Sequence, residues 1–140
     1  MTRQDFIDQI KRHEGYRDHV YRDTEGHLTG GWGHAFLEGS TLPPGACESL
    51  FNYDIAIAVG GFASLELGDI GTVRRYAFIN MIFNLGITKL LEFKKMIAAA
   101  RTGDWETAAM EMLNSKWADQ VGSRATELSE IVRTGIYSMK

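Results

Sequence analysis

The stretch EGYRDHVYRDTEGHLTGGWGH, residues 14–34, guides the interpretation of the whole chain. A helical pattern ends at Glu14, and Asp23 stands nine positions later at the head of a DTEG turn. Thr29 follows six positions further on and leads into a glycine-broken run that ends in a histidine. Two carboxyl groups in unlike surroundings with a hydroxyl nearby suit hydrolysis of an acetal, which needs an acid for the leaving oxygen and a base or nucleophile across the sugar.

This segment resembles the active-site signature of the T-even phage lysozyme family. The resemblance covers most of the chain, because further matching segments keep the family's order. It implies an α+β, lysozyme-like fold: a mainly helical body, a small N-terminal β hairpin or sheet lobe, and a cleft between them. The further segments are LFNYD (50–54), VRRYAFINMIFNLG (73–86), GDWETAA (103–109), SKWADQ (115–120), Arg124 with Ala125, and RTG (133–135).

Length and composition fit one globular domain. A chain of 140 residues with 44% hydrophobic residues can bury a sizeable core without disulfides or metal. We expect a single lysozyme-like domain over residues 1–140, with the small β lobe at about 15–37 and the helical lobe formed by 1–14 and 44–140. A monomer is expected.

The single cysteine, Cys47, excludes an internal disulfide, so synthesis in a cytoplasm is the simplest expectation. No N-terminal apolar run resembles a signal peptide, and no stretch approaches the ~20 apolar residues that span a bilayer. We therefore expect the protein in the host cytoplasm on synthesis, without stable membrane insertion, and acting on the cell wall or periplasm. A separate membrane-permeabilising protein would deliver it.

The net charge of −3 argues against general nucleic-acid binding, which needs a basic surface. It also fits a cell-wall hydrolase poorly, because wall polymers are polyanionic and would attract a cationic enzyme. Either binding is local, inside a cleft, or something else supplies targeting.

Apolar residues at helical spacing, with capping and glycine signals, predict a series of helices, the one over 71–85 being central. A twisted hairpin or three-stranded sheet is expected between the first two helices. The predicted helices span residues 2–13, 46–59, 62–67, 71–85, 89–101, 104–114, 116–119 and 123–133.

Three residues are the catalytic candidates. Glu14 follows a helix whose negative end disfavours the anion, as a general acid requires. Asp23 would stay ionised in an open turn, and the family's role for Thr29 is to hold the attacking water with Asp23. That implies an inverting reaction. By frequency alone, a solvated glutamate, a turn-capping aspartate and an ordinary strand threonine are the commoner interpretations.

The resemblance also implies supporting residues. Arg124 aligns with the arginine that pairs with the catalytic acid, although a surface arginine is the alternative. His34 and Asp54 match a structural pair that ties the small lobe to the following helix, without a chemical role.

Substrate contacts are predicted for Phe83, Asn84 and Gln120. An aromatic residue at helical spacing is more often core, so Phe83 has two interpretations. Two other sugar-contact positions of the family are changed and fall on Met96 and Glu111.

No metal and no cofactor is expected. His13, His19, His27 and His34 lack the spacing and third ligand of a catalytic zinc site. The DTEG turn lacks the alternating oxygen ligands of a calcium loop.

The resulting hypothesis is a muramidase that cleaves the β-1,4 bond between N-acetylmuramic acid and N-acetylglucosamine in peptidoglycan glycan strands, as a phage endolysin in host lysis. The alternatives are a non-hydrolytic wall-binding or virion structural module on the same fold, or a lytic transglycosylase, which needs the glutamate but no water-holding Asp/Thr pair.

Overall fold

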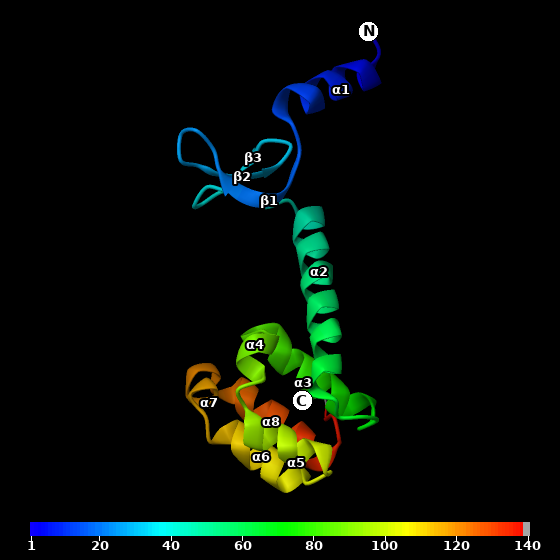
Figure 1. The fold of residues 1–140 in the computed structure, drawn as a ribbon, viewed down its shortest axis with the longest axis vertical. Coiled ribbons are helices and arrows are strands. Elements are labelled where there is room, and N and C mark those ends of the chain that lie inside the picture. The colour runs from blue at the N-terminus through cyan, green and yellow to red at the C-terminus, as the bar shows by residue number, and fades with distance from the viewer. Residues whose placement is uncertain (139–140) are drawn as a thin grey trace. The chain divides into compact units, whose positions relative to one another are not determined.

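The computed structural model of the protein describes residues 1–138 (Figure 1). The chain divides into two compact units, Met1–Pro44 and Gly45–Lys140, here called the N-terminal unit and the C-terminal unit. Each is described by itself. That residues 1–140 form one domain, with 1–14 in its helical lobe, stays a prediction.

The N-terminal unit begins with α1, Arg3–Glu14. The Thr2 hydroxyl accepts the Asp5 N–H at 3.1 Å, and the Asp5 carboxylate accepts the Thr2 N–H at 2.8 Å. This reciprocal capping box satisfies two amides that a helix start leaves unpaired, and it confirms the predicted start. The helix buries none of its residues.

A three-stranded antiparallel sheet follows, in the order β1-β2-β3. Its strands are β1 (Arg17–Arg22), β2 (Leu28–Gly31) and β3 (His34–Ala35). Arg22 pairs with Leu28 next to the DTEG turn, and an irregularity interrupts the β1–β2 pairing before Tyr21. The predicted small sheet is confirmed, and with it the α+β fold class.

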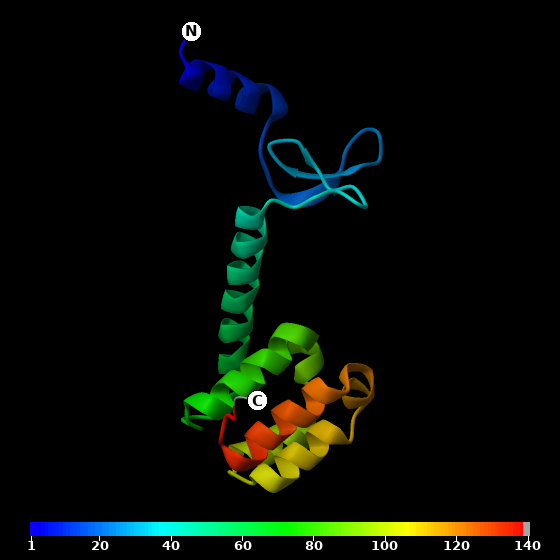
Figure 2. The ribbon, with the colours of Figure 1, turned by 180° about the vertical axis from the view of Figure 1, so that it is seen from behind.

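The C-terminal unit is helical (Figure 2). Helix α6 packs against both α5 and α8, and α3 packs against α8. The elements are α2 (Pro44–Phe62), the 3-10 turn η1 (Ala63–Leu65), α3 (Thr72–Leu85), α4 (Ile87–Leu90), α5 (Lys94–Arg101), α6 (Trp105–Leu113), α7 (Lys116–Val121) and α8 (Ser123–Thr134).

The central helix was predicted correctly. Helix α3 contributes five buried residues, and its Phe78 and Met81 have no exposed surface. Gly86 ends the helix with φ 83°, a conformation that suits glycine, and its N–H donates to the Ile82 carbonyl at 2.7 Å. This core fixes the positions of the helices that carry the candidate polar residues.

Two predicted helix boundaries are wrong. Helix α2 continues past Gly60 to Phe62. A Cβ at position 61 would lie 3.2 Å from the Ile87 Cβ, so a side chain there would crowd Ile87. Glycine at this position thus serves packing rather than helix termination. The predicted helix at 62–67 is only the η1 turn.

The predicted helix 89–101 is two helices. Helix α4 ends at Leu90, and the Phe93 N–H donates back to the Leu90 carbonyl at 2.9 Å in a turn before α5. Leu90 is fully buried and Phe93 packs on the core, so tertiary packing overrides helix propensity here. Among residues 1–138 no helix has the length and apolarity to cross a membrane.

Candidate active site

Glu14 is the last residue of α1, and its carboxyl group lies against Gly33 in the turn between β2 and β3. A Cβ on Gly33 would stand 2.8 Å from the Glu14 Oε2. Gly33 also has φ +77°, a backbone conformation that favours glycine. The missing side chain at position 33 therefore makes room for the candidate acid.

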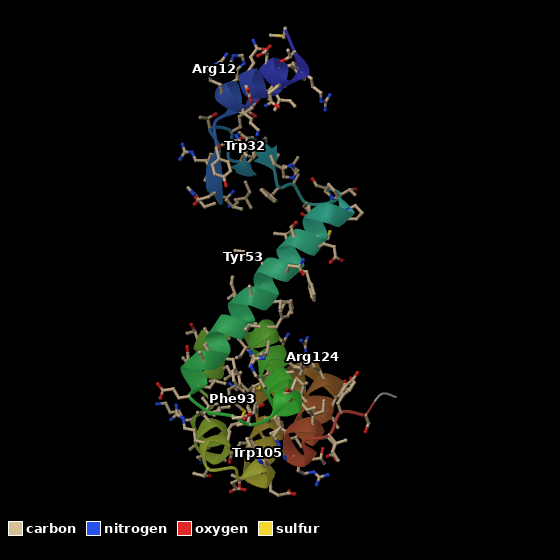
Figure 3. All side chains as sticks on the ribbon, turned by 90° about the vertical axis from the view of Figure 1, so that its right-hand side faces the viewer. Arg12, Trp32, Tyr53, Phe93, Trp105 and Arg124 are labelled. Carbon is tan, nitrogen blue, oxygen red and sulfur yellow. The ribbon has the colours of Figure 1, made fainter. Side chains whose placement is uncertain are left out.

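Trp32, next to Gly33, connects the end of α1 to the sheet (Figure 3). Its ring lies 4.7 Å from the Tyr16 ring, centroid to centroid, and the Lys11 Nζ sits 4.3 Å from the Trp32 ring centroid. A cation–π contact at an exposed site contributes about 0.5–1 kcal/mol, and an aromatic pair contributes a similar amount. Glu14 is thus held beside the β2–β3 turn, because Trp32 of that turn contacts Lys11 before Glu14 and Tyr16 after it.

Asp23 organises the DTEG turn. Its Oδ1 accepts the N–H groups of Glu25 at 2.9 Å and His27 at 2.8 Å. The Asp23 carbonyl accepts the Gly26 N–H at 3.0 Å, which confirms the predicted tight turn. The His27 ring lies 3.8 Å from the second carboxylate oxygen.

These donors hold the pKa of Asp23 below its ordinary value, chiefly through the backbone N–H of His27. A hydrogen bond to the charged form stabilises that form. Asp23 is therefore an anion at neutral pH. The same bonds also serve the turn-capping role that the sequence left open, so the two roles coexist.

Thr29 is only 5% exposed, and its hydroxyl donates to the His27 carbonyl at 3.1 Å. The register pairs Tyr21 with Thr29, and the Asp23 N–H donates to the His27 carbonyl at 2.8 Å. Asp23 directly follows β1 and is two residues from Tyr21, the partner of Thr29, so the two candidate residues belong to the same end of one strand pair.

In the C-terminal unit, Arg124 of α8 binds Asn80 of α3. Its Nε and Nη2 donate to the Asn80 Oδ1 at 3.0 and 2.7 Å, so the amide oxygen takes two bonds from one guanidinium. The predicted pair of Arg124 with Glu14 involves both units and stays a prediction.

The predicted substrate residues also lie in this unit. The Asn84 Oδ1 accepts the indole N–H of the buried Trp117 at 2.7 Å. Gln120 lines a pocket of about 650 Å³ together with Trp117. Phe83 is 38% exposed, and its ring lies 5.7 Å from that of Phe51, so it is not the fully buried core residue of the second interpretation.

His34 and Asp54 lie in different units. The His34 ring meets the Phe36 ring edge-on at 4.9 Å, and Asp54 borders a hollow of about 180 Å³ beside Phe83. Their predicted pairing stays a prediction. Within residues 1–138, no three His, Cys, Asp or Glu side chains gather as a metal site requires.

Several partners of the candidate residues escaped the sequence analysis. The GGWG run predicts a bend and a close backbone approach, but not that Gly33 and Trp32 shape the position of Glu14. Lys11 stands three residues before Glu14, one helical turn away, which was a usable signal. No local signal marks Asn80 as the acceptor for Arg124, because 44 residues separate them.

Together, one unit presents a helix-end carboxyl group, an ionised turn carboxylate and a nearly buried hydroxyl. This set suits hydrolysis of a glycosidic bond. A carboxyl group at a helix end, a carboxylate that can take a proton from water and a hydroxyl that can bind water are the groups that this reaction uses.

Comparison with known proteins agrees with this chemistry. The phage lysozyme family model matches residues 11–133. Two proteins of Dictyostelium discoideum, described as probable T4-type lysozymes 1 and 2, are each 27% identical over 158 residues, covering 91% of this chain and 93% of each relative. The pre-baseplate central spike protein Gp5 of Enterobacteria phage T4 is 29% identical over 157 residues, covering 91% of this chain and 27% of Gp5. The chain belongs to the phage lysozyme family.

Proposed function

We propose that this protein is a muramidase that hydrolyses the β-1,4 bond between N-acetylmuramic acid and N-acetylglucosamine in peptidoglycan. The observation that carries the proposal is the contrast between two carboxyl groups of one unit. Glu14 ends a helix against Gly33, whereas Asp23 accepts two backbone N–H groups and is held as an anion. Separate acid and base roles at one pH require such unlike surroundings.

In the proposed reaction, Glu14 donates its proton to the glycosidic oxygen as the bond from that oxygen to the anomeric carbon breaks. Asp23 and Thr29 hold a water on the opposite face of the sugar ring. The water oxygen bonds to the anomeric carbon, and Asp23 takes its proton. The configuration at that carbon inverts.

The experiment that best separates a muramidase from the two alternative functions is a digest of purified peptidoglycan followed by mass spectrometry. Hydrolysis gives reducing muramic acid ends, which retain the added water. Products with anhydro-muramyl ends would identify a lytic transglycosylase instead, and absence of any cleavage would favour the wall-binding module. Proton NMR of the first product anomer reports inversion or retention.

Glu14→Gln tests the acid directly, because it removes the proton donor while keeping the shape. We expect the rate to fall by roughly 10²–10⁴, the contribution of general acid–base catalysis. Glu25→Gln is the matched control: Glu25 is an exposed carboxylate of the same hairpin, and its loss should leave the rate near that of the wild type. Equal rates for the wild type and Glu14→Gln would remove Glu14 from the mechanism.

For the biological role, we propose a monomeric endolysin that is made in the host cytoplasm and is delivered to the wall by a separate membrane-permeabilising protein. The absence of a candidate membrane span in residues 1–138 is compatible with this role. Expression in bacteria with and without chloroform treatment tests it. We expect lysis only after the inner membrane is permeabilised, and lysis of untreated cells would contradict the proposal.

A further inference from the structure

The His27 side chain lies beside one oxygen of Asp23, the candidate base. The other oxygen, Oδ1, already accepts two backbone N–H groups, those of Glu25 and of His27 itself. A carboxylate oxygen has two lone pairs, so Oδ2 is the oxygen that can bind the attacking water. The His27 Nδ1 lies 3.8 Å from this Oδ2. The proposed water and the imidazole therefore depend on the same atom.

The neutral imidazole leaves this oxygen open. A separation of 3.8 Å is longer than a hydrogen bond, in which nitrogen and oxygen lie about 2.7–3.2 Å apart. A protonated ring is attracted by the carboxylate, and a movement of about 1 Å suffices to form a charge-assisted hydrogen bond. The protonated ring then holds the oxygen that the water needs, and its charge makes Asp23 a weaker base.

The charged groups around the His27 ring favour this pairing. Glu25 Oε2 also lies 3.8 Å from Nδ1, but the Glu25 side chain is 78% exposed, whereas that of Asp23 is 35% exposed. Solvent screens the Glu25 pair more strongly, so a protonated ring is drawn chiefly to Asp23. The cation on the neighbouring strand β1 is Arg22, whose Nη1 donates to the Gly26 carbonyl at 3.0 Å and so faces the backbone of the turn.

The imidazole is not needed to build the turn. The His27 backbone makes the bonds: its N–H donates to Asp23, and its carbonyl accepts the Asp23 N–H at 2.8 Å and the Thr29 hydroxyl at 3.1 Å. The ring itself is half exposed. Packing therefore does not explain a histidine here, and another side chain can replace it without breaking these bonds.

We propose that His27 is a positioning residue of the proposed hydrolysis: its neutral side chain leaves Oδ2 of Asp23 to the attacking water, and its protonated side chain occupies that oxygen. The inference rests on the proposed function, which supplies the reaction. Histidines change charge between about pH 5 and 8. The pKa of Asp23 lies below its ordinary value, chiefly because of the His27 N–H, so Asp23 by itself stays ionised over this range. Activity then falls on the acid side at a higher pH than the ionisation of Asp23 alone imposes.

The test compares initial hydrolysis rates of purified peptidoglycan at about pH 8 and about pH 5, the limits of histidine titration. His27→Gln removes the charge and keeps a polar side chain. Its matched control is His19→Gln, which removes another exposed imidazole of the same hairpin, one that contacts Asp18 at 3.0 Å instead of Asp23. His27→Lys is positively charged at both pH values and so imitates the protonated ring.

We expect the ratio of the rate at the higher pH to that at the lower pH to be about fivefold larger in the wild type and in His19→Gln than in His27→Gln, the effect of one exposed ion pair. The contribution of Glu14 is common to these proteins and cancels. At the higher pH, His27→Lys should be about fivefold slower than His27→Gln for the same reason.

A second measurement needs no turnover. The NMR signal of the Asp23 carboxyl carbon should shift in step with the His27 ring signals in the wild type between about pH 8 and about pH 5. In His27→Gln the carboxyl carbon should not shift over this range. A merely structural role of His27 would not produce this coupling.

Equal rate ratios in the wild type and His27→Gln overturn the inference and leave the muramidase proposal standing. So does an Asp23 carboxyl carbon that does not respond to the His27 ring. No cleavage by the wild type at either pH is a different outcome: it overturns the proposed function, and with it the role of His27 in that reaction, whatever the NMR signals show.

Discussion

The two units differ in how they hold their residues in place. The C-terminal unit surrounds α3 with a continuous core, in which Phe78, Met81 and Leu90 have no exposed surface. The N-terminal unit buries little: α1 has no buried residue, and Thr29 is one of two buried polar residues in the described part of the chain. Its geometry depends on caps, turns and glycines. The proposed catalytic residues therefore lie in the less buried unit, where hydrogen bonds rather than core packing fix the positions of the side chains.

Phe78→Ala should have the largest effect on stability. Its ring is completely buried in the core, so we expect the C-terminal unit to lose about 3–5 kcal/mol, the usual cost of truncating a core phenylalanine. Urea unfolding measures this free energy. Phe6→Ala is the counterpart in the N-terminal unit. Phe6 is 50% exposed, and its truncation should cost less than about 1.5 kcal/mol. Similar losses of unfolding free energy in Phe78→Ala and Phe6→Ala would show that the two units depend equally on buried side chains.

Asn84→Ala should come next. It leaves the indole N–H of the buried Trp117 without its 2.7 Å acceptor, and an unsatisfied buried donor costs about 1–3 kcal/mol. The control is Asn52→Ala, an exposed asparagine on α2. An unchanged urea midpoint for Asn84→Ala would show that a water molecule accepts the Trp117 N–H in place of the Asn84 side-chain oxygen.

Gly33→Ala tests whether the N-terminal unit positions Glu14 by excluding a side chain. A methyl group there would stand 2.8 Å from the Glu14 Oε2, so the carboxyl group must move. We expect a roughly tenfold lower hydrolysis rate, because a displaced catalytic group loses its alignment.

Gly39→Ala is the matched control. Gly39 has φ +85°, which imposes the same kind of backbone strain, but a Cβ there meets nothing within 4 Å. Its hydrolysis rate should stay close to that of the wild type. Equal losses of activity in the two alanine variants would assign the effect to backbone strain rather than to the Glu14 carboxyl.

The smallest expected effect is the pH dependence of the hairpin. The pKa of Asp23 is lower in the folded state, chiefly through the His27 N–H, so its stabilisation is present above the unfolded pKa of about 4 and is lost as the pH falls through the folded pKa. Asp23→Asn should remove this part of the acid sensitivity. The readout is unfolding of the N-terminal unit at pH 2–5, and Asp69→Asn, in the other unit, should not change it. If the stability of Asp23→Asn depended on pH in the same way as that of the wild type, the lowered pKa of Asp23 would not contribute to the stability of the N-terminal unit.

The features that local sequence determines were predicted well. The start of the helix predicted from residue 2, the DTEG turn and the end of the helix predicted over 71–85 each depend on residues within four positions. Errors arose where distant packing decides, as when Gly61 admits Ile87 and α2 continues through two glycines. The partners of the candidate residues were missed for the same reason, since the Arg124–Asn80 bonds and the Gly33–Glu14 contact join separate elements.

The distribution of tryptophans has a practical consequence. Trp32 is the single tryptophan of residues 1–44 and is 48% exposed, whereas Trp117 is 4% exposed in the other unit. Indoles in water emit at longer wavelengths and are quenched by iodide, and buried ones are not. Trp105, the third tryptophan, is partly buried against the core of that same unit. The N-terminal unit thus contributes one exposed indole and the C-terminal unit two shielded ones, so iodide quenching lets the melting of each unit be followed without any added label.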